Sequence, residues 1–210
     1  TGETATEVIA CFNSTIEPVL KGMDAFQYAR IMETLKKKLP NNPSARALVD
    51  MALYDLIAQK AGVPLYKMLG GFRKSIATSI TIGIMPVHMA MAYTREHIKR
   101  GFKILKIKGG IHVEEDIEKI IRIREIAGDQ IKIRFDANQG FTVEQSLKFV
   151  GQTKKVRLEL IEQPTPKGQS DMLRKVTRAV PIPVMADESL MSLRDAFRIA
   201  RGGLADMVNV

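Results

Sequence analysis

Short apolar runs alternate with longer, helix-like segments in the second part of the chain, from Ser75 onward. Runs of this length, bounded by turn residues, are typical of buried β-strands. The six strand candidates are residues 76–84, 102–108, 131–136, 157–162, 182–187 and 205–210. Repeated strand–helix units predict a parallel sheet with helices outside it.

The segments between these runs carry the signals of helix ends. Thr142 and Gln145 have the spacing of a capping box, and Ser192 with Asp195 has a similar one. Residues 113–127 place apolar side chains at helical spacing, and their first turn is acidic, which suits the positive end of a helix dipole. These signals support a helix in each interval.

The first 70 residues differ, because they predict helices without strands. Pro43 suits the first turn of a long helix that ends before Gly62. One mostly apolar stripe of this helix comprises Leu48, Met51, Ala52, Asp55 and Leu56. The Gly70–Gly71 pair then marks a turn. We therefore expect two domains, a helical one over residues 1–72 and a second one over residues 73–210.

Six strand–helix units in a row favour a (β/α) barrel of the TIM type over a doubly wound sheet, which remains the alternative α/β fold. A closed barrel of this type has eight strands, and the sixth candidate here runs to Val210. The chain also starts without a methionine. We therefore expect a fragment of a longer protein that contains about six of the eight strands.

Composition narrows the range of partners. The net charge of +9 raises the question of nucleic acid, but the basic residues are spread over many segments and the chain has no tryptophan. No apolar run is long enough for a membrane span. The single cysteine, Cys11, fits a reducing compartment. We expect a cytoplasmic protein that binds neither nucleic acid nor membrane.

Three acidic residues end successive strand candidates: Asp136, Glu162 and Asp187, at intervals of 162 − 136 = 26 and 187 − 162 = 25 residues. A lysine pair, Lys106 and Lys108, ends the strand before them. Because side chains alternate along a strand, both lysines point to one side, and the last residue of each strand lies at the carboxyl rim of the barrel. Barrel enzymes have their active sites at that rim.

Three carboxylates held together repel one another unless a cation lies between them, and hard oxygen ligands suit Mg²⁺. A lysine accepts a proton only when it is neutral, and a second positive charge beside it lowers its pKa. A metal ion with a lysine base is suited to removing the proton alpha to a carboxylate. Each motif alone also has an ordinary structural meaning, such as a helix cap or an exposed strand edge. Arg134, on the same face, is expected to act as a counter-ion to the acids.

Four motifs carry a family resemblance: Lys-Ile-Lys108-Gly-Gly, Asp136-Ala-Asn-Gln-Gly140, Ile-Glu162-Gln-Pro and Ala-Asp187-Glu-Ser. They resemble the motifs of the enolase superfamily, muconate lactonizing enzyme subgroup, and within it those of the dipeptide (L-Ala-D/L-Glu) epimerases. The resemblance extends over essentially the whole chain. Residues 1–70 resemble the helical part of the α+β capping domain of that family.

The resemblance implies a role for each motif. Asp136, Glu162 and Asp187 would bind Mg²⁺, and Lys108 would be the acid/base on one face of the alpha carbon. Lys106 would contact the substrate carboxylate, and Thr81 would also touch the substrate. The implied protein is a homo-oligomeric isomerase that acts on a small carboxylate, a dipeptide or an N-acylamino acid. A second lysine would follow Asn209–Val210, where this sequence stops, so we expect the chain alone to be inactive.

Other readings stay open. Within the subgroup, N-acylamino acid racemase, o-succinylbenzoate synthase and cycloisomerase share the same proton abstraction. Outside it, the chain would be a non-catalytic barrel piece that binds a cation or a partner. The net charge of +9 keeps a polyanion-binding module as the remaining alternative.

Overall fold

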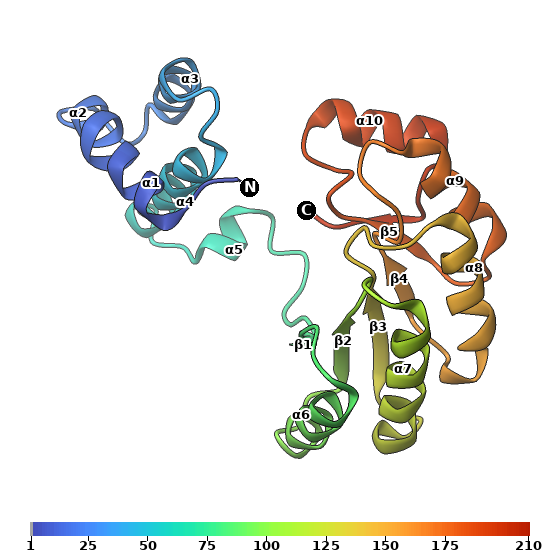
Figure 1. Cartoon of the computed structure of the whole chain (residues 1–210). Coiled ribbons are helices and arrows are strands. Elements are labelled where there is room, and N and C mark those ends of the chain that lie inside the picture. Colours follow the sequence, from blue (N-terminus) through green and yellow to red (C-terminus); the bar gives the residue numbers. More distant parts are fainter. Residues whose placement is uncertain (1) are drawn as a thin grey trace. The chain divides into compact units, whose positions relative to one another are not determined.

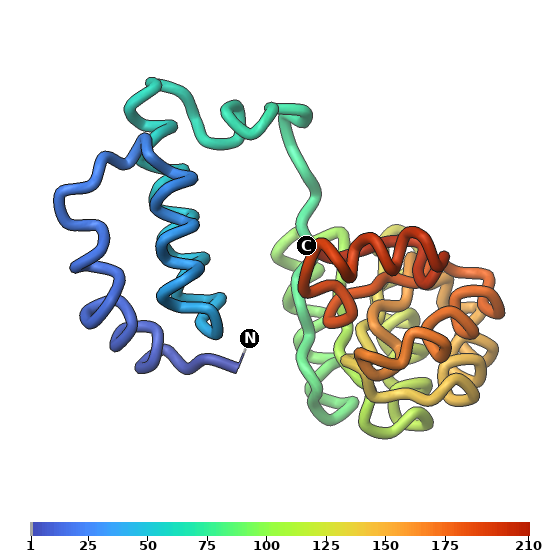
Figure 2. Tube along the Cα trace, turned by 90° about the horizontal axis from the view of Figure 1, so that it is seen from above, coloured from blue at the N-terminus to red at the C-terminus, as the bar shows by residue number. Residues whose placement is uncertain are grey.

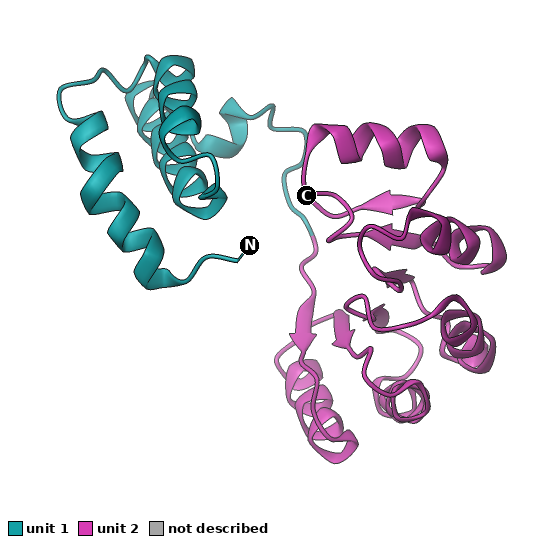
Figure 3. Ribbon diagram, turned by 45° about the horizontal axis from the view of Figure 1, so that its top comes forward, with its two compact units in different colours: residues 1–76 teal, residues 77–210 magenta. Residues whose placement is uncertain are grey.

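The computed structural model describes residues 2–210. The chain divides into two compact units, residues 1–76 and 77–210 (Figure 3). The sequence placed this boundary near residue 72, at the turn that precedes the first strand candidate. Within residues 2–210, no helix combines the length and the apolar character that a membrane span requires.

The first unit is helical, and its opening helix changes pitch along its length. Its elements are α1 (Ala5–Cys11), the π-helical turn η1 (Phe12–Ile16), α2 (Glu17–Leu20), α3 (Tyr28–Lys38), α4 (Pro43–Lys60) and the short α5 (Leu65–Met68). Thr4 caps α1 in a capping box with Glu7. Figure 2 shows the segment from α1 to α2 running alongside α3 and α4.

The core of this unit shows which face of α4 is buried. The buried side chains are Ile16, Ile31, Leu35, Leu39, Ala45, Val49 and Leu53. Met51, on the stripe singled out from the sequence, is 64% exposed, whereas Val49 and Leu53 are buried. The helix carries apolar residues on more than one face, so its periodicity alone does not tell which face packs inward.

The second unit is a six-stranded parallel sheet with the strands in sequence order. The strands are β1 (Ile80–Ile82), β2 (Ile104–Lys108), β3 (Lys132–Asp136), β4 (Leu160–Glu162), β5 (Val184–Ala186) and β6 (Met207–Val208). The alternating helices are α6 (Val87–Lys99), α7 (Val113–Ala127), α8 (Val143–Gln152) with the short 3₁₀ turn η2 (Lys154–Val156), α9 (Ser170–Ala179) and α10 (Leu193–Gly202). The strands are shorter than their candidates, because only part of each run pairs with neighbouring strands.

The helices α6 to α10 follow one another around the convex side of the sheet (Figures 1 and 3). A doubly wound sheet would reverse its strand order at a switch point, and this sheet has no reversal among its six strands. The order therefore agrees with part of a (β/α) barrel, as the sequence predicted. Both helix starts expected at Thr142 and Ser192 are also present, as side-chain caps of α8 and α10.

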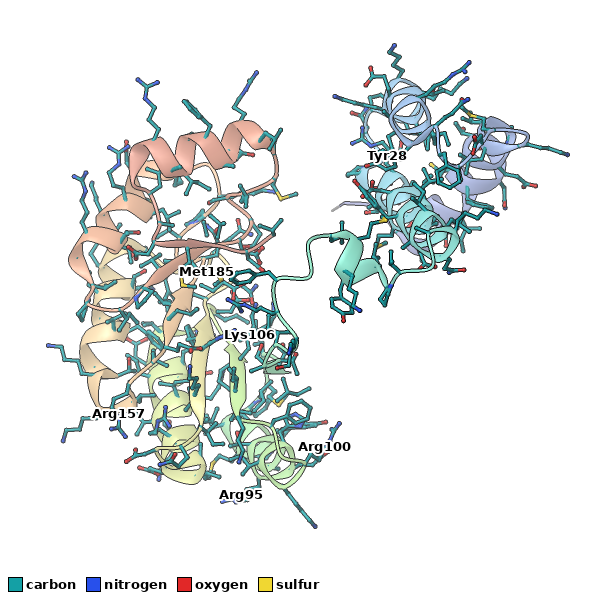
Figure 4. The ribbon with its side chains drawn as sticks, turned by 180° about the vertical axis from the view of Figure 1, so that it is seen from behind. Tyr28, Arg95, Arg100, Lys106, Arg157 and Met185 are labelled. Atoms are coloured by element: carbon teal, nitrogen blue, oxygen red, sulfur yellow. The ribbon has the colours of Figure 1, made fainter. Side chains whose placement is uncertain are left out.

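The two faces of the sheet differ in chemistry. On the helix side, Ile107, Phe135 and Ile161 are fully buried. Phe135 packs against Phe149 of α8 with ring centroids 4.2 Å apart. Alternation then places Lys106, between Leu105 and Ile107, on the opposite, open face of β2, where Figure 4 shows it. This confirms the predicted orientation of the strand that carries the two lysines.

The loops after β2 and β3 lie so close that they exclude side chains. A Cβ atom on Gly140 would overlap the carbonyl group of Gly110, and one on Gly110 would overlap the carbonyl group of Ala137. Gly110 also has a φ of +101°, which favours glycine. This contact fixes the loop that follows Lys108 against the loop that follows Asp136.

We expect Gly140→Ala to destabilise the protein by about 3 kcal/mol, because backbone atoms cannot move aside for the new methyl group. Gly151→Ala is the matched control. Gly151 lies in α8 with open space around its Cα, so alanine there should stabilise by about 0.5–1 kcal/mol. Urea denaturation of both variants measures the difference, and equal stabilities would contradict the close packing of the two loops.

Candidate active site

The register of the parallel strands brings the candidate residues to one level of the sheet. Lys108 on β2 is paired with Asp136 on β3, which is paired with Glu162 on β4. Lys106, two residues before Lys108 on β2, is paired in register with Thr81 on β1. Lys106, Lys108, Asp136, Glu162 and Thr81 therefore lie on four adjacent strands, toward their carboxyl ends.

An ion cluster lies at the centre of this group. The Nζ atom of Lys106 is 3.0 Å from Oδ2 of Asp136 and 2.8 Å from Oε1 of Glu162. Asp136 is fully buried and Glu162 is 3% exposed. Two carboxylates on neighbouring strands thus share one ammonium group in a place that water hardly reaches.

The pKa values of Lys106 and Glu162 are both raised, for different reasons. Burial lowers the pKa of Lys106, but the hydrogen bonds and charges of Glu162 and Asp136 outweigh it, so the pKa is raised overall. Burial also raises the pKa of Glu162, and the charges of Asp136 and Asp187 add to it against the opposing effect of Lys106. Lys106 therefore carries a positive charge, and burial is the main reason why the pKa of Glu162 stays raised even with the ammonium beside it.

Lys108 lies nearer to solvent than Lys106. Its side chain is 35% exposed, compared with 17% for Lys106. Its Nζ atom is 3.3 Å from Oδ2 of Asp136 and donates a hydrogen bond of 3.3 Å to Oδ1 of Asn138. Asn138 in turn donates its backbone N–H to Oδ1 of Asp136. Lys108 is thus an amine at the rim, held beside the charge of Lys106 and open to a ligand. Thr81 is exposed on the edge strand β1.

Asp187 is the one acid that the cluster does not include. It follows β5, is half-buried, and influences the pKa of Glu162 by its charge. Among residues 2–210, no three histidine, cysteine, aspartate or glutamate side chains are gathered closely enough to hold a metal ion. The structure therefore brings Asp136 and Glu162 together and leaves Asp187 on the adjacent strand end. Beside Asp187 and Asn209 is a hollow of about 470 Å³ with mostly apolar walls.

The donor set nevertheless fits a hard divalent cation. Oδ2 of Asp136 is buried and accepts no hydrogen bond of good geometry, although the ammonium groups of Lys106 and Lys108 lie 3.0 and 3.3 Å away. A buried carboxylate oxygen of this kind, beside a second buried carboxylate on the next strand, is a suitable ligand for a cation. Carboxylate oxygens are the ligands that Mg²⁺ prefers.

Two residues behave differently from the sequence-based expectation. Arg134 does not pair with Asp136 or Glu162; its Nε atom lies 2.5 Å from Oε2 of Glu159. The reason is its level on β3, where it faces Leu160 instead of Glu162. Asn209 was not assigned a role, yet its Nδ2 atom lies 3.3 Å from Oε1 of Glu162. The sequence signal that could have indicated a site role for Asn209 is its position near the end of the last strand candidate.

Comparison with known proteins agrees with this arrangement. The enolase C-terminal domain-like family matches residues 89–210, and the N-terminal domain of the mandelate racemase/muconate lactonizing enzymes matches residues 1–70. The chain belongs to the enolase superfamily. The resemblance inferred from the four motifs is therefore confirmed.

Members of the superfamily with different names match nearly the whole chain. An L-Ala-D/L-Glu epimerase from Clostridium acetobutylicum is 36% identical over 212 residues, which cover 100% of this chain and 59% of the relative. An L-Lys-D/L-Arg epimerase from Desulforapulum autotrophicum is 41% identical over 196 residues, covering 93% of this chain and 55% of the relative. Muconate cycloisomerase 1 from Rhodococcus opacus is 33% identical over 210 residues, covering 99% of this chain and 56% of the relative. The chain thus spans less than two thirds of their length.

A solved superfamily structure has the same fold over the whole chain. The dipeptide epimerase from Enterococcus faecalis, complexed with Mg and the dipeptide L-Leu-L-Tyr, matches with a TM-score of 0.92 and 37% identity. The match covers 100% of this chain and 59% of the neighbour. This confirms the fold class predicted from the sequence.

In the metal-free protein, we expect Lys106→Met to destabilise the fold by about 3 kcal/mol at neutral pH, because two buried carboxylates lose their counter-ion. The pKa of Glu162 is already raised, and removal of Lys106 raises it further. The folded variant then binds protons more tightly than the unfolded chain, so its stability falls as pH rises. The deficit should therefore be smaller at about pH 5 than at about pH 8.

Lys132→Met provides the control, because Lys132 makes a largely exposed ion pair with Glu159 on the same sheet. Its loss should cost less than about 1 kcal/mol. Thermal denaturation in the presence of EDTA measures both variants. Equal losses in the two variants, or a Lys106→Met deficit that does not change with pH, would contradict the central role of the Lys106 ion cluster.

Proposed function

We propose that this chain supplies the metal-binding and proton-transfer groups of a Mg²⁺-dependent enzyme that removes the proton alpha to a carboxylate, as an isomerase of dipeptides. The observation that carries the proposal is the burial of Asp136 and Glu162 around a single ammonium, with a second lysine beside them at the rim. The names of the superfamily relatives support the choice of reaction.

We propose a role for each site residue, beginning with the three acids. Asp136, Glu162 and Asp187 are the proposed ligands of the ion, since they end three successive strands. When bound, the ion would offset the negative charge that develops on the substrate carboxylate. Asp187 lies on the adjacent strand end, so binding requires its carboxylate to approach the other two.

Lys108 is the proposed acid/base, because it is the more exposed of the two amines and lies beside a second positive charge. It would take the alpha proton on its Nζ atom from one face of the alpha carbon, and epimerisation requires a proton to return on the opposite face. Lys106, whose raised pKa keeps it charged, would bind the substrate carboxylate. Thr81, exposed and level with Lys106, would contact the substrate from the edge strand.

Dipeptides are the proposed substrates, and N-acylamino acids are the nearest alternative. The matched relatives include epimerases named for different dipeptides, and a solved neighbour is complexed with L-Leu-L-Tyr. A cycloisomerase is the second candidate, because muconate cycloisomerase 1 matches 99% of the chain. Homo-oligomerisation, a cytoplasmic location and the lack of a nucleic-acid or membrane partner stay predictions.

Mg²⁺ should raise the melting temperature of the protein. At an ion concentration about 100 times the dissociation constant, binding adds about 2.7 kcal/mol, or about 5–10 °C for a chain of this size. Asp136→Asn should abolish the response, because it removes the buried charge at nearly constant volume. Asp129→Asn, which changes an exposed aspartate paired with Arg157, should keep it. A full response in Asp136→Asn, measured by differential scanning fluorimetry, would discard the metal site.

Solvent deuterium should enter the alpha position of L-Ala-L-Glu. Because the chain spans 59% of the Clostridium acetobutylicum relative, the assay protein joins this chain to the remaining segments of that relative. Lys108→Ala should slow the exchange by about 100-fold or more, since it removes the base. Lys103→Ala, an exposed lysine before β2, should leave it unchanged. Proton NMR measures the exchange, and its absence with dipeptides but presence with N-acylamino acids would favour the racemase.

A further inference from the structure

Gln163 joins the two strand ends that carry Glu162 and Asp187. It follows Glu162 directly, at the end of β4, and its side chain is fully buried. Its Oε1 atom accepts the backbone N–H of Asp187 at 2.9 Å and that of Ser189 at 3.1 Å. The side chain therefore holds the backbone of the third acidic residue from the neighbouring strand.

The amide of Gln163 uses its full hydrogen-bonding capacity. Its Nε2 atom donates to the carbonyl oxygen of Thr165 at 2.8 Å and to Oγ of Ser189 at 2.9 Å. A carboxamide has two donors and two acceptor positions, and all four are matched here. Flipping the amide would set its donors against the N–H groups of Asp187 and Ser189, so only one orientation satisfies the site.

The backbone of Gln163 is also under constraint. Its φ is +33°, which is unfavourable for a residue with a side chain. Hydrogen bonds on both sides hold this conformation: its N–H donates to Met185 on β5, and its carbonyl oxygen accepts from Gln139 after β3. Asn138 and Gln139, after Asp136, have positive φ values as well. Positive φ values of this kind therefore follow two of the three proposed metal ligands, Asp136 and Glu162.

We propose that Gln163 is a positioning residue, whose side-chain amide sets the reach of Asp187 toward Asp136 and Glu162. The inference rests on the proposed metal-binding function. Asp187 is the acid that lies outside the ion cluster, and β5 is only three residues long. The loop after β5 is fixed to β4 by the contacts of one side chain, and this determines where the Asp187 carboxylate can move.

Gln163→Met tests the proposal, because methionine has a similar length and keeps none of the four hydrogen bonds. We expect the dissociation constant for Mg²⁺, measured by isothermal titration of the chain with MgCl₂, to rise about 10- to 100-fold. Hydrogen–deuterium exchange gives a readout that needs no metal. The amides of Asp187 and Ser189 should exchange faster in Gln163→Met, while those of β2 and β3 keep their protection.

Two control variants separate positioning from general stability. Thr165→Val changes a fully buried residue of the same loop, whose hydroxyl has no hydrogen-bond partner among the described residues. It should leave Mg²⁺ affinity unchanged. Thr177→Val removes the hydrogen bond from α9 to the carbonyl oxygen of Leu204, which precedes β6. It should lower stability without altering Mg²⁺ affinity.

The outcomes distinguish this inference from the proposed function. If the wild-type chain does not bind Mg²⁺, the metal site itself is wrong. If the wild type binds and Gln163→Met binds equally well, only the positioning role is overturned. If Gln163→Met does not fold, Ser189→Ala decides, because it removes one acceptor of the same amide. Ser189→Ala should bind Mg²⁺ more weakly than Thr165→Val does. Equal Mg²⁺ affinities of Ser189→Ala and Thr165→Val would overturn the inference.

Discussion

Two carboxylates buried on neighbouring strands impose the main constraint on this protein. Asp136 and Glu162 are paired in register and almost inaccessible to water, so their charges must be balanced at that place. The structure provides two ammonium groups, those of Lys106 and Lys108, at 3.0 and 3.3 Å from Oδ2 of Asp136, and burial still raises the pKa of Glu162. Carboxylate oxygens are also suited to a divalent cation, and the balance between ammonium groups and metal ion links the stability of the fold to its proposed chemistry.

The loops at the carboxyl ends of the strands hold this arrangement in place. Gly110 and Gly140 bring two of these loops into backbone contact, which only residues without a Cβ allow. Gln163 connects the next two strand ends through its buried amide. The unfavourable φ of Gln163 is therefore maintained by contacts made elsewhere, in keeping with strain that is concentrated where precise placement of side chains is required.

The superfamily relatives that match this chain are named for different substrates. Epimerases named for different dipeptides and a cycloisomerase match almost the same extent of the chain. Similarity over this extent of the chain therefore accompanies relatives that are named for different substrates. It does not by itself distinguish among those substrates.

Local patterns were enough to predict the helix caps at Thr142 and Ser192 and the face of β2 on which Lys106 lies, because capping and alternation depend on neighbours along the chain. Packing in three dimensions was needed to show which face of α4 is buried, that Arg134 pairs with Glu159, and that Asp187 lies outside the cluster of the other two acids. These features depend on the level of one strand against the next and on which surfaces cover one another. Distances across a sheet are fixed by packing between segments far apart in the chain, which local patterns do not encode.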